Sequence, residues 1–256
     1  MQRCKRRDAG GAANPNRPSV PVPPTPDTEQ EGRAASERGH LEILGRAAWQ
    51  SVEPRYGNPN ACWCGILWQR EAMYFHFGTR KIVEAAATLL RIEPCKRMSY
   101  LRLLKLLYIA DRESLRESGR PIVGTRPVAM DYGPVLSEVL DLAKGQHRDE
   151  GVWSEFIRKD GYAVTLEKNP GVLSLSRYEI ERLTKTAEEY RNTDDWEIIE
   201  QTHAFEEWKG NYRQGTSTAI PLQDMIRAVG RADELDDILQ EAERTTILRR
   251  LLDSAA

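Results

Sequence analysis

Residues 103–111 read LLKLLYIAD and form the centre of the most strongly patterned part of the sequence. At 3.6 residues per turn, one side of residues 98–117, where a core would cover it, holds Leu103, Leu104, Leu107, Tyr108 and Leu115. Asp111 falls in the middle of that apolar side. The stretch therefore predicts a long core helix that carries one carboxylate on its buried face.

A carboxylate buried alone costs several kcal/mol, so Asp111 needs hydrogen-bond donors from elsewhere in the fold. We expect them from residues 119–135, which we call the latch, because this loop follows the helix directly. In this interpretation Asp111 is a structural clamp, and a catalytic or metal-binding carboxylate is the alternative. The candidate donors are the backbone N–H groups of the latch, Tyr132, Arg120, Arg126 and His203.

The side of the helix opposite the leucines is cationic, and we expect it to be solvated. A patch for an acidic partner is the alternative. The four candidate partner-binding residues are Arg102, Lys105, Arg112 and Arg116.

The latch contains AMDYGPV at residues 129–135, which reads as a short extended piece that runs into a helix. Gly133 permits tight backbone geometry, and Pro134 would set the backbone angle of a first helical position. We expect Val135 to lie on the buried face of that helix.

The rest of the sequence adds several helices and one hairpin, so the fold class is mainly α (α+β). We expect a single helical domain with a small antiparallel β-hairpin and a disordered N-terminal extension. The hairpin turns at Asp160-Gly161, and Ser176-x-x-Glu179 spells a capping box. The predicted helices cover residues 78–92, 98–117, 177–191, 195–201, 221–229 and 232–252.

Residues 1–72 have a different composition, with 8 of the 14 prolines and no sustained helical or strand period. Segment 1–40 is predicted to be disordered, because it cannot bury enough surface to offset the entropy of ordering. Residues 61–69, ACWCGILWQ, form an apolar run with no evident partner. Because Met73 follows, a second hypothesis is that residues 1–72 are a non-native extension, so that the domain spans 73–256.

Composition excludes several classes of partner. The 256 residues carry a net charge of −2, so binding to nucleic acid is unlikely on electrostatic grounds. No apolar run approaches the roughly 20 residues of a membrane span, and no apolar stretch follows the basic start as in a secretory signal. We therefore expect a cytoplasmic protein that does not contact a membrane.

No familiar catalytic, nucleotide-binding or metal-binding motif is present. Cys62-x-Cys64 lacks a second ligand pair. His203 lies close to Glu206 and Glu207, but we favour a structural histidine over a metal or acid–base site. Trp153, Trp196 and Trp208 are expected to be core or subdomain-contact aromatics, with interface anchors as the alternative. The sequence thus predicts a protein that is not an enzyme, with no catalytic residue, metal or cofactor.

Residues 103–145 resemble the core of the SocA-like antitoxin domain, also called the Panacea domain. The matching motifs are LLKLLYIAD at 103–111, GRPI at 119–122 and YGPV at 132–135. Leu175-Ser176 and Thr202-His203 fit the later part of the family pattern, and the resemblance covers about residues 75–215. The structural signature residues are Lys105, Tyr108, Asp111, Pro121, Tyr132, Gly133, Pro134, Val135, His203 and Trp208.

The resemblance implies an antitoxin that neutralises a cognate toxin, encoded by an adjacent gene, through direct protein–protein contact. It brings no catalytic residues. One alternative is an adaptor that delivers the toxin to a cytosolic protease, and another is a transcriptional autoregulator that uses the cationic helix face. A hydrolase or metal enzyme with Asp111, His203 and Glu207 is the remaining hypothesis.

Overall fold

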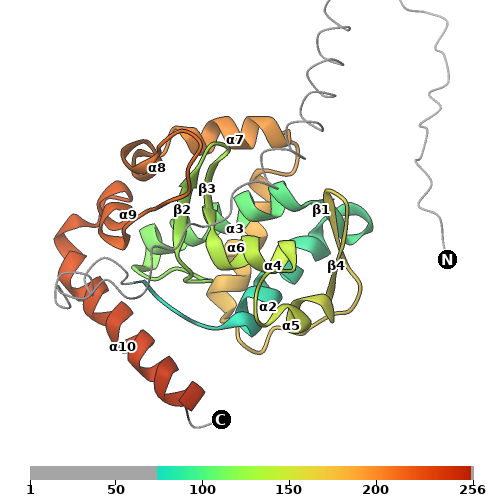
Figure 1. Cartoon of the computed structure of the whole chain (residues 1–256), viewed down its shortest axis with the longest axis horizontal. Helices are drawn as coiled ribbons and strands as arrows, with labels where there is room; N and C mark the ends of the chain where they lie inside the picture. Colours follow the sequence, from blue (N-terminus) through green and yellow to red (C-terminus); the bar gives the residue numbers. More distant parts are fainter. Residues whose placement is uncertain (1–73, 255–256) are drawn as a thin grey trace, which may run out of the picture. The chain divides into compact units, whose positions relative to one another are not determined.

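The computed structural model describes residues 74–254 of the chain (Figure 1). This part is mainly helical and contains two small antiparallel sheets, which confirms the predicted fold class. The predictions for residues 1–72, including the Cys62-x-Cys64 pair, lie outside the described residues.

Three helices pack against one another at the centre: α2 (Thr79–Ile92), α3 (Tyr100–Ser118) and α6 (Arg177–Glu189). Each is close to its predicted range. Helix α3 begins where the side chain of Ser99 accepts the N–H of Arg102, and it ends at Gly119 in a left-handed conformation. Ser176 and Glu179 form the predicted capping box of α6. The capping box depends only on two residues that are close in the sequence, so the sequence was sufficient to locate the start of α6.

The predicted hairpin at Asp160-Gly161 is present as β4 (Ile157–Asp160) and β5 (Ala163–Leu166). A short strand, β1 (Arg97–Ser99), pairs with β5 and leads directly into α3. This three-stranded sheet, in the order β1-β5-β4, joins the start of the core helix to the middle of the chain.

The second sheet has the order β3-β2-β6 and contains the end of the latch. Its strands are β2 (Pro127–Met130), β3 (Gly133–Leu136) and β6 (Thr218–Ala219). The prediction that Pro134 opens a helix is wrong, because the next helix, α4 (Ser137–Lys144), begins three residues later. Val135, predicted on a helical face, is a buried strand residue.

The pairing explains why a proline fits in β3. Asp131 and Tyr132 form a two-residue turn, with Met130 opposite Gly133. Backbone groups alternate along an antiparallel ladder, so at the next position Pro134 directs its amide side away from β2. The missing N–H of proline therefore costs no hydrogen bond in this edge strand.

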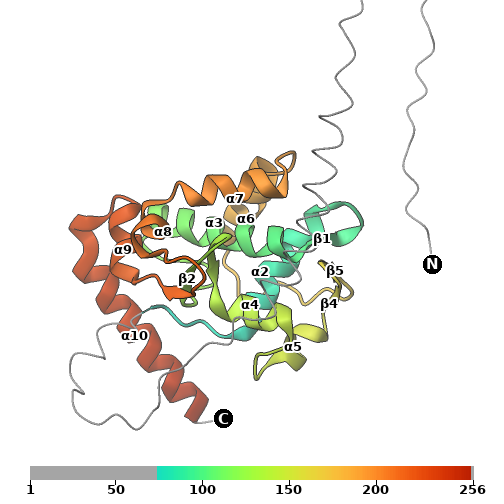
Figure 2. The same cartoon turned by 45° about the horizontal axis from the view of Figure 1, so that its top comes forward.

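The remaining helices are α5 (Glu150–Ser154), α7 (Asp195–His203), α8 (Glu206–Asn211), α9 (Leu222–Ala228) and α10 (Leu235–Ser254). Helix α7 contacts both α3 and β3, and α8 follows it after a short turn. Figure 2 shows α7 lying alongside α3, and α10 running along the margin of the helical part. The short helices α5 and α8 were not predicted. None of the helices between residues 74 and 254 is long and apolar enough to cross a membrane.

Candidate functional site

Asp111 is 2% exposed and accepts three backbone hydrogen bonds from the latch. Its Oδ1 accepts the N–H groups of Ile122 at 3.0 Å and Val123 at 2.7 Å, and its Oδ2 accepts that of Gly124 at 3.0 Å. The predicted clamp is confirmed, and the donors are the first of the expected alternatives. Pro121 lies just before the three donors, so the chain enters this turn with a restricted backbone.

Burial raises the pKa of Asp111 from 3.8 to about 6, although the three N–H groups and Lys81 oppose this change. Between these two values the folded state binds more protons at this carboxyl than the unfolded state does. Its contribution to stability is therefore complete below pH 3.8 and is lost as the pH rises through about 6.

We expect this loss to be visible when the protein is compared with the Asp111→Asn variant, which does not titrate. From pH 4 to pH 7, the free energy of unfolding of the unaltered protein should fall relative to the variant by about 2.4 kcal/mol, because one pKa unit corresponds to 1.36 kcal/mol and the unfolded carboxyl is already partly ionised at pH 4. Urea unfolding at several pH values measures this difference. A difference that stays constant over the range would contradict the titration of Asp111.

Lys105 is fully buried, although it was predicted on the solvated cationic face. Its Nζ donates to the backbone carbonyl of Pro134 at 2.8 Å, and burial lowers its pKa well below the usual value. This carbonyl faces away from β2, because Pro134 directs both of its backbone groups to the outer side of β3. Lys105 thus joins the outer edge of β3 to the core helix.

Two further members of the predicted cationic face are also engaged within the fold. Arg102 is 8% exposed, and its guanidinium donates to the carbonyls of Tyr190 and Thr193 and pairs with Asp195 at 3.2 Å. Arg112 donates to Glu207 at 2.8 Å. The expectation of a solvated face is therefore wrong for Lys105, Arg102 and Arg112. The cause is that β3, α7 and the Glu207 side chain of α8 cover this side of α3.

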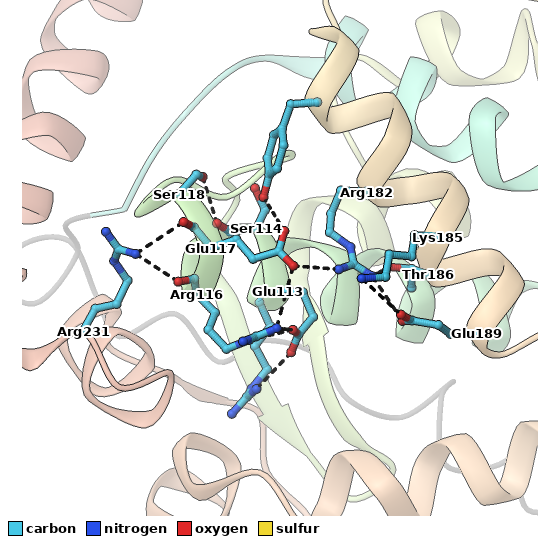
Figure 3. Close-up of polar contacts among 12 residues, drawn as sticks. Glu113, Ser114, Arg116, Glu117, Ser118, Arg182, Lys185, Thr186, Glu189 and Arg231 are labelled. Atoms are coloured by element: carbon cyan, nitrogen blue, oxygen red, sulfur yellow. Dashed lines mark hydrogen bonds and ion pairs between the residues drawn. The ribbon is translucent and has the colours of Figure 1, made fainter.

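Figure 3 shows the surroundings of Arg116, the fourth predicted cation. Its side chain is half exposed and pairs with Glu113 at 2.6 Å. Close by, the buried Arg182 of α6 pairs with Glu117 at 2.9 Å, and Arg231 donates to the carbonyl of Arg116 at 3.0 Å. This network ties the end of α3 to α6 and to the segment before α10. A partner-binding role for the four cations stays a prediction, and among them Arg116 alone has a half-exposed side chain.

Tyr108 reaches across to α8, where its hydroxyl donates to Oε1 of Glu207 at 3.1 Å. The same oxygen accepts Nε of Arg112, and the guanidinium of Arg112 lies 4.2 Å from the ring centre of Phe205. Burial, followed by the charge of Glu207, raises the pKa of Tyr108 well above its usual value. Glu207 is therefore the buried anion that holds α8 on α3, a role the sequence did not reveal.

The structure does not bring Asp111, His203 and Glu207 together as a metal or acid–base site. Asp111 binds the latch and Glu207 binds the α3 side chains. Between residues 74 and 254, no three His, Cys, Asp or Glu side chains gather as a metal site would require. Desolvation lowers the pKa of His203, which favours a neutral ring.

Gly133 lies where α3 and α7 meet the tip of the hairpin. Its φ is +83°, a conformation that residues with a Cβ rarely adopt. A Cβ added here would lie 2.5 Å from Oγ1 of Thr202 and 2.8 Å from Nζ of Lys105. The backbone of the hairpin therefore approaches both helices as closely as only glycine allows.

Aromatic rings surround the same turn. His203 stacks on Trp208 with ring centres 4.3 Å apart, and Trp208 stacks on Tyr212 at 4.6 Å. The indole N–H of Trp208 donates to the carbonyl of Met130 at 3.0 Å, and the hydroxyl of Tyr212 donates to Asp131 at 3.0 Å. These contacts agree with the interpretation of His203 and Trp208 as structural residues, whereas nothing in the sequence indicated the contacts of Tyr212.

Tyr132 completes the surface of the turn with an edge-on contact to Trp196, at a ring-centre distance of 6.4 Å. Trp196 is 44% exposed, so it is not a core aromatic, and the subdomain-contact and interface interpretations of this residue remain. Trp153 is 2% exposed and is a core residue, as predicted. We call Trp196, Tyr132 and the exposed acids Asp194, Glu197 and Glu200 the α7 face.

Comparison with known proteins identifies a family for the central part of the chain. Residues 103–209 match the family model described as Antitoxin SocA-like, Panacea domain. No curated protein and no solved structure matches the chain. The matched range begins within α3 and ends within α8, so it includes the Asp111 clamp, the hairpin and the α7 face.

Proposed function

We propose that the chain, which carries an antitoxin SocA-like, Panacea domain at residues 103–209, neutralises a toxin by direct protein–protein contact. The toxin would be encoded by an adjacent gene. Residues 73–256 would form the antitoxin unit, and it would act in the cytoplasm without catalysing a reaction.

One observation supports binding over catalysis: the polar signature residues are used to hold the fold together. Asp111 binds the latch, Lys105 binds the hairpin and Trp208 binds the carbonyl of Met130. A platform held in this way pays little entropy when a partner docks, because its backbone is already ordered. Binding over about 800 Å² per partner would suffice to occlude the working surface of a toxin.

The α7 face is our candidate for the contact surface. Trp196 supplies a large, half-exposed aromatic side chain, and Tyr132 contacts its ring edge-on. Tryptophan and tyrosine are over-represented among residues that contribute most to binding. The acidic residues at the rim fit a basic partner surface and would speed association with it.

We expect Trp196→Ala to weaken toxin binding by about 30-fold or more, which corresponds to at least about 2 kcal/mol. The fold should persist, because the side chain is half exposed and its polar neighbours remain paired. Titration of the toxin with the purified variant gives the affinity, and thermal unfolding checks the fold.

Leu173→Ala is the matched control, since Leu173 is 93% exposed and lies in the loop before α6. It removes a comparable apolar group from outside the α7 face and should leave affinity unchanged. Equal losses in the two variants, or no loss in either, would contradict the assignment of the α7 face.

Growth of cells that produce the neighbouring gene product, with and without this protein, tests neutralisation itself. We expect arrest by the neighbour alone and rescue on co-production. The half-life of the toxin separates two mechanisms: a shortened half-life indicates delivery to a protease, whereas an unchanged half-life indicates occlusion. A neighbour that is harmless on its own would contradict the proposed function.

A further inference from the structure

The last two turns of α10 carry an apolar stripe on their outer side. It consists of Ile247, Leu248, Leu251 and Leu252, which are 49% to 61% exposed. Their spacing places them on one face of the helix. The opposite face packs on the fold, where Ile238 and Ala242 are buried. A contiguous set of large exposed aliphatic residues is the usual mark of a missing partner.

The described part of the chain starts beside α10. The hydroxyl of Thr246 donates to the carbonyl of Tyr74 at 3.0 Å. Four residues further along, Gly78 lies against Arg249, whose guanidinium would be 2.9 Å from an added Cβ. The residues that precede Tyr74 in the sequence therefore leave the fold next to the end of α10.

Those preceding residues contain the apolar run that had no evident partner. Residues 62–68 read CWCGILW and offer Trp63, Ile66, Leu67 and Trp68. Five residues lie between Trp68 and Tyr74, and the six steps from one Cα to the next can span up to about 20 Å when extended. A helix is about 10–12 Å wide with its side chains, so this length is enough to reach around α10 to the stripe.

A second copy of the chain is a weaker candidate for the stripe. Four half-exposed aliphatic side chains offer well under the roughly 800 Å² per partner that a stable interface buries. A segment of the same chain needs less area, because a short tether holds it at an effective concentration in the millimolar range. We therefore propose that residues 62–68 of the same chain dock on the apolar stripe of α10. This makes them part of the folded protein rather than a dispensable extension.

Hydrogen exchange of the full-length chain tests the proposal. The variant Ile66→Asp with Leu67→Asp places two charges in the docking segment, and Val20→Asp with Val22→Asp is the matched control at an apolar site further from Tyr74. We expect the amides of residues 247–252 to exchange at least about tenfold faster in the first variant and at an unchanged rate in the control. Unchanged exchange in α3 shows that both variants are folded.

The reciprocal variant, Leu248→Asp with Leu251→Asp, should accelerate exchange in residues 62–68. Unchanged exchange of residues 247–252 after the Ile66 and Leu67 substitutions would overturn the proposal. Protection that depends on protein concentration, together with a doubled mass in solution, would assign the stripe to a second copy and would overturn it as well. Neither outcome involves the toxin, so the proposed function is tested separately.

Discussion

Replacing Asp111 with alanine is expected to lower the free energy of unfolding by about 4 kcal/mol at pH 7. The variant leaves three buried N–H groups, those of residues 122–124, without an acceptor. An unsatisfied buried donor costs about 1–3 kcal/mol, and part of this cost is regained because the carboxylate itself is no longer buried. Such a loss is a large share of the roughly 5–15 kcal/mol of a typical domain. Urea unfolding followed by circular dichroism measures it.

Two further variants serve as an intermediate case and a control for Asp111→Ala. Asp111→Asn keeps one acceptor oxygen and should lose about half as much, because at least one N–H group stays paired. Asp160→Ala removes a 59% exposed carboxylate that forms a long surface ion pair with Arg97, and it should change stability by less than about 0.5 kcal/mol. A loss below about 1 kcal/mol in Asp111→Ala would mean that the clamp does not stabilise the latch.

Replacing Gly133 with alanine is expected to cost about 3 kcal/mol. The left-handed backbone conformation accounts for about 1–2 kcal/mol of this. The remainder comes from forcing apart Thr202 and Lys105, because overpacking a tight site typically costs about 1–3 kcal/mol. The same unfolding experiment measures the change.

Gly161→Ala separates the two causes, because Gly161 has a φ of +60° and open space around its Cβ position. It should show the conformational cost alone, about 1–2 kcal/mol. If both glycine variants lose the same free energy, the close approach of the hairpin to α3 and α7 contributes nothing to stability.

The clamp could be predicted from the sequence because its parts are close together in the chain. Helical periodicity places Asp111 among leucines, and the energetic cost of burial requires donors. The donors lie only 11 to 13 residues further on. The capping box of α6 could be predicted for the same reason, because Ser176 and Glu179 lie three residues apart in the sequence.

The error at Pro134 has a different origin. The backbone angle of proline suits both a first helical turn and an edge strand, so the residue alone does not distinguish them. Pairing decides the outcome, since β2 has β3 on one side and β6, about 90 residues further on, on the other. A local pattern carries no information about that distant strand.

The burial of Lys105 and Arg112 could not be predicted for the same reason. A helical wheel shows which side of α3 is apolar, but it does not show what covers the other side. The covering groups come from Pro134 and from Glu207, nearly 100 residues beyond Arg112. Once those partners are in place, the charges are satisfied within the fold, and the exposed aromatic on α7 becomes the better candidate for partner contact.

The most direct test of the account is a titration of the purified full-length chain with the purified product of the adjacent gene. We predict a stoichiometric complex with a Kd below about 1 µM, which corresponds to a binding free energy more favourable than about −8 kcal/mol. Trp196→Ala should weaken the complex and Leu173→Ala should not. A neighbouring product that arrests growth on its own, yet shows no binding to the folded chain in this titration, would contradict neutralisation by direct contact.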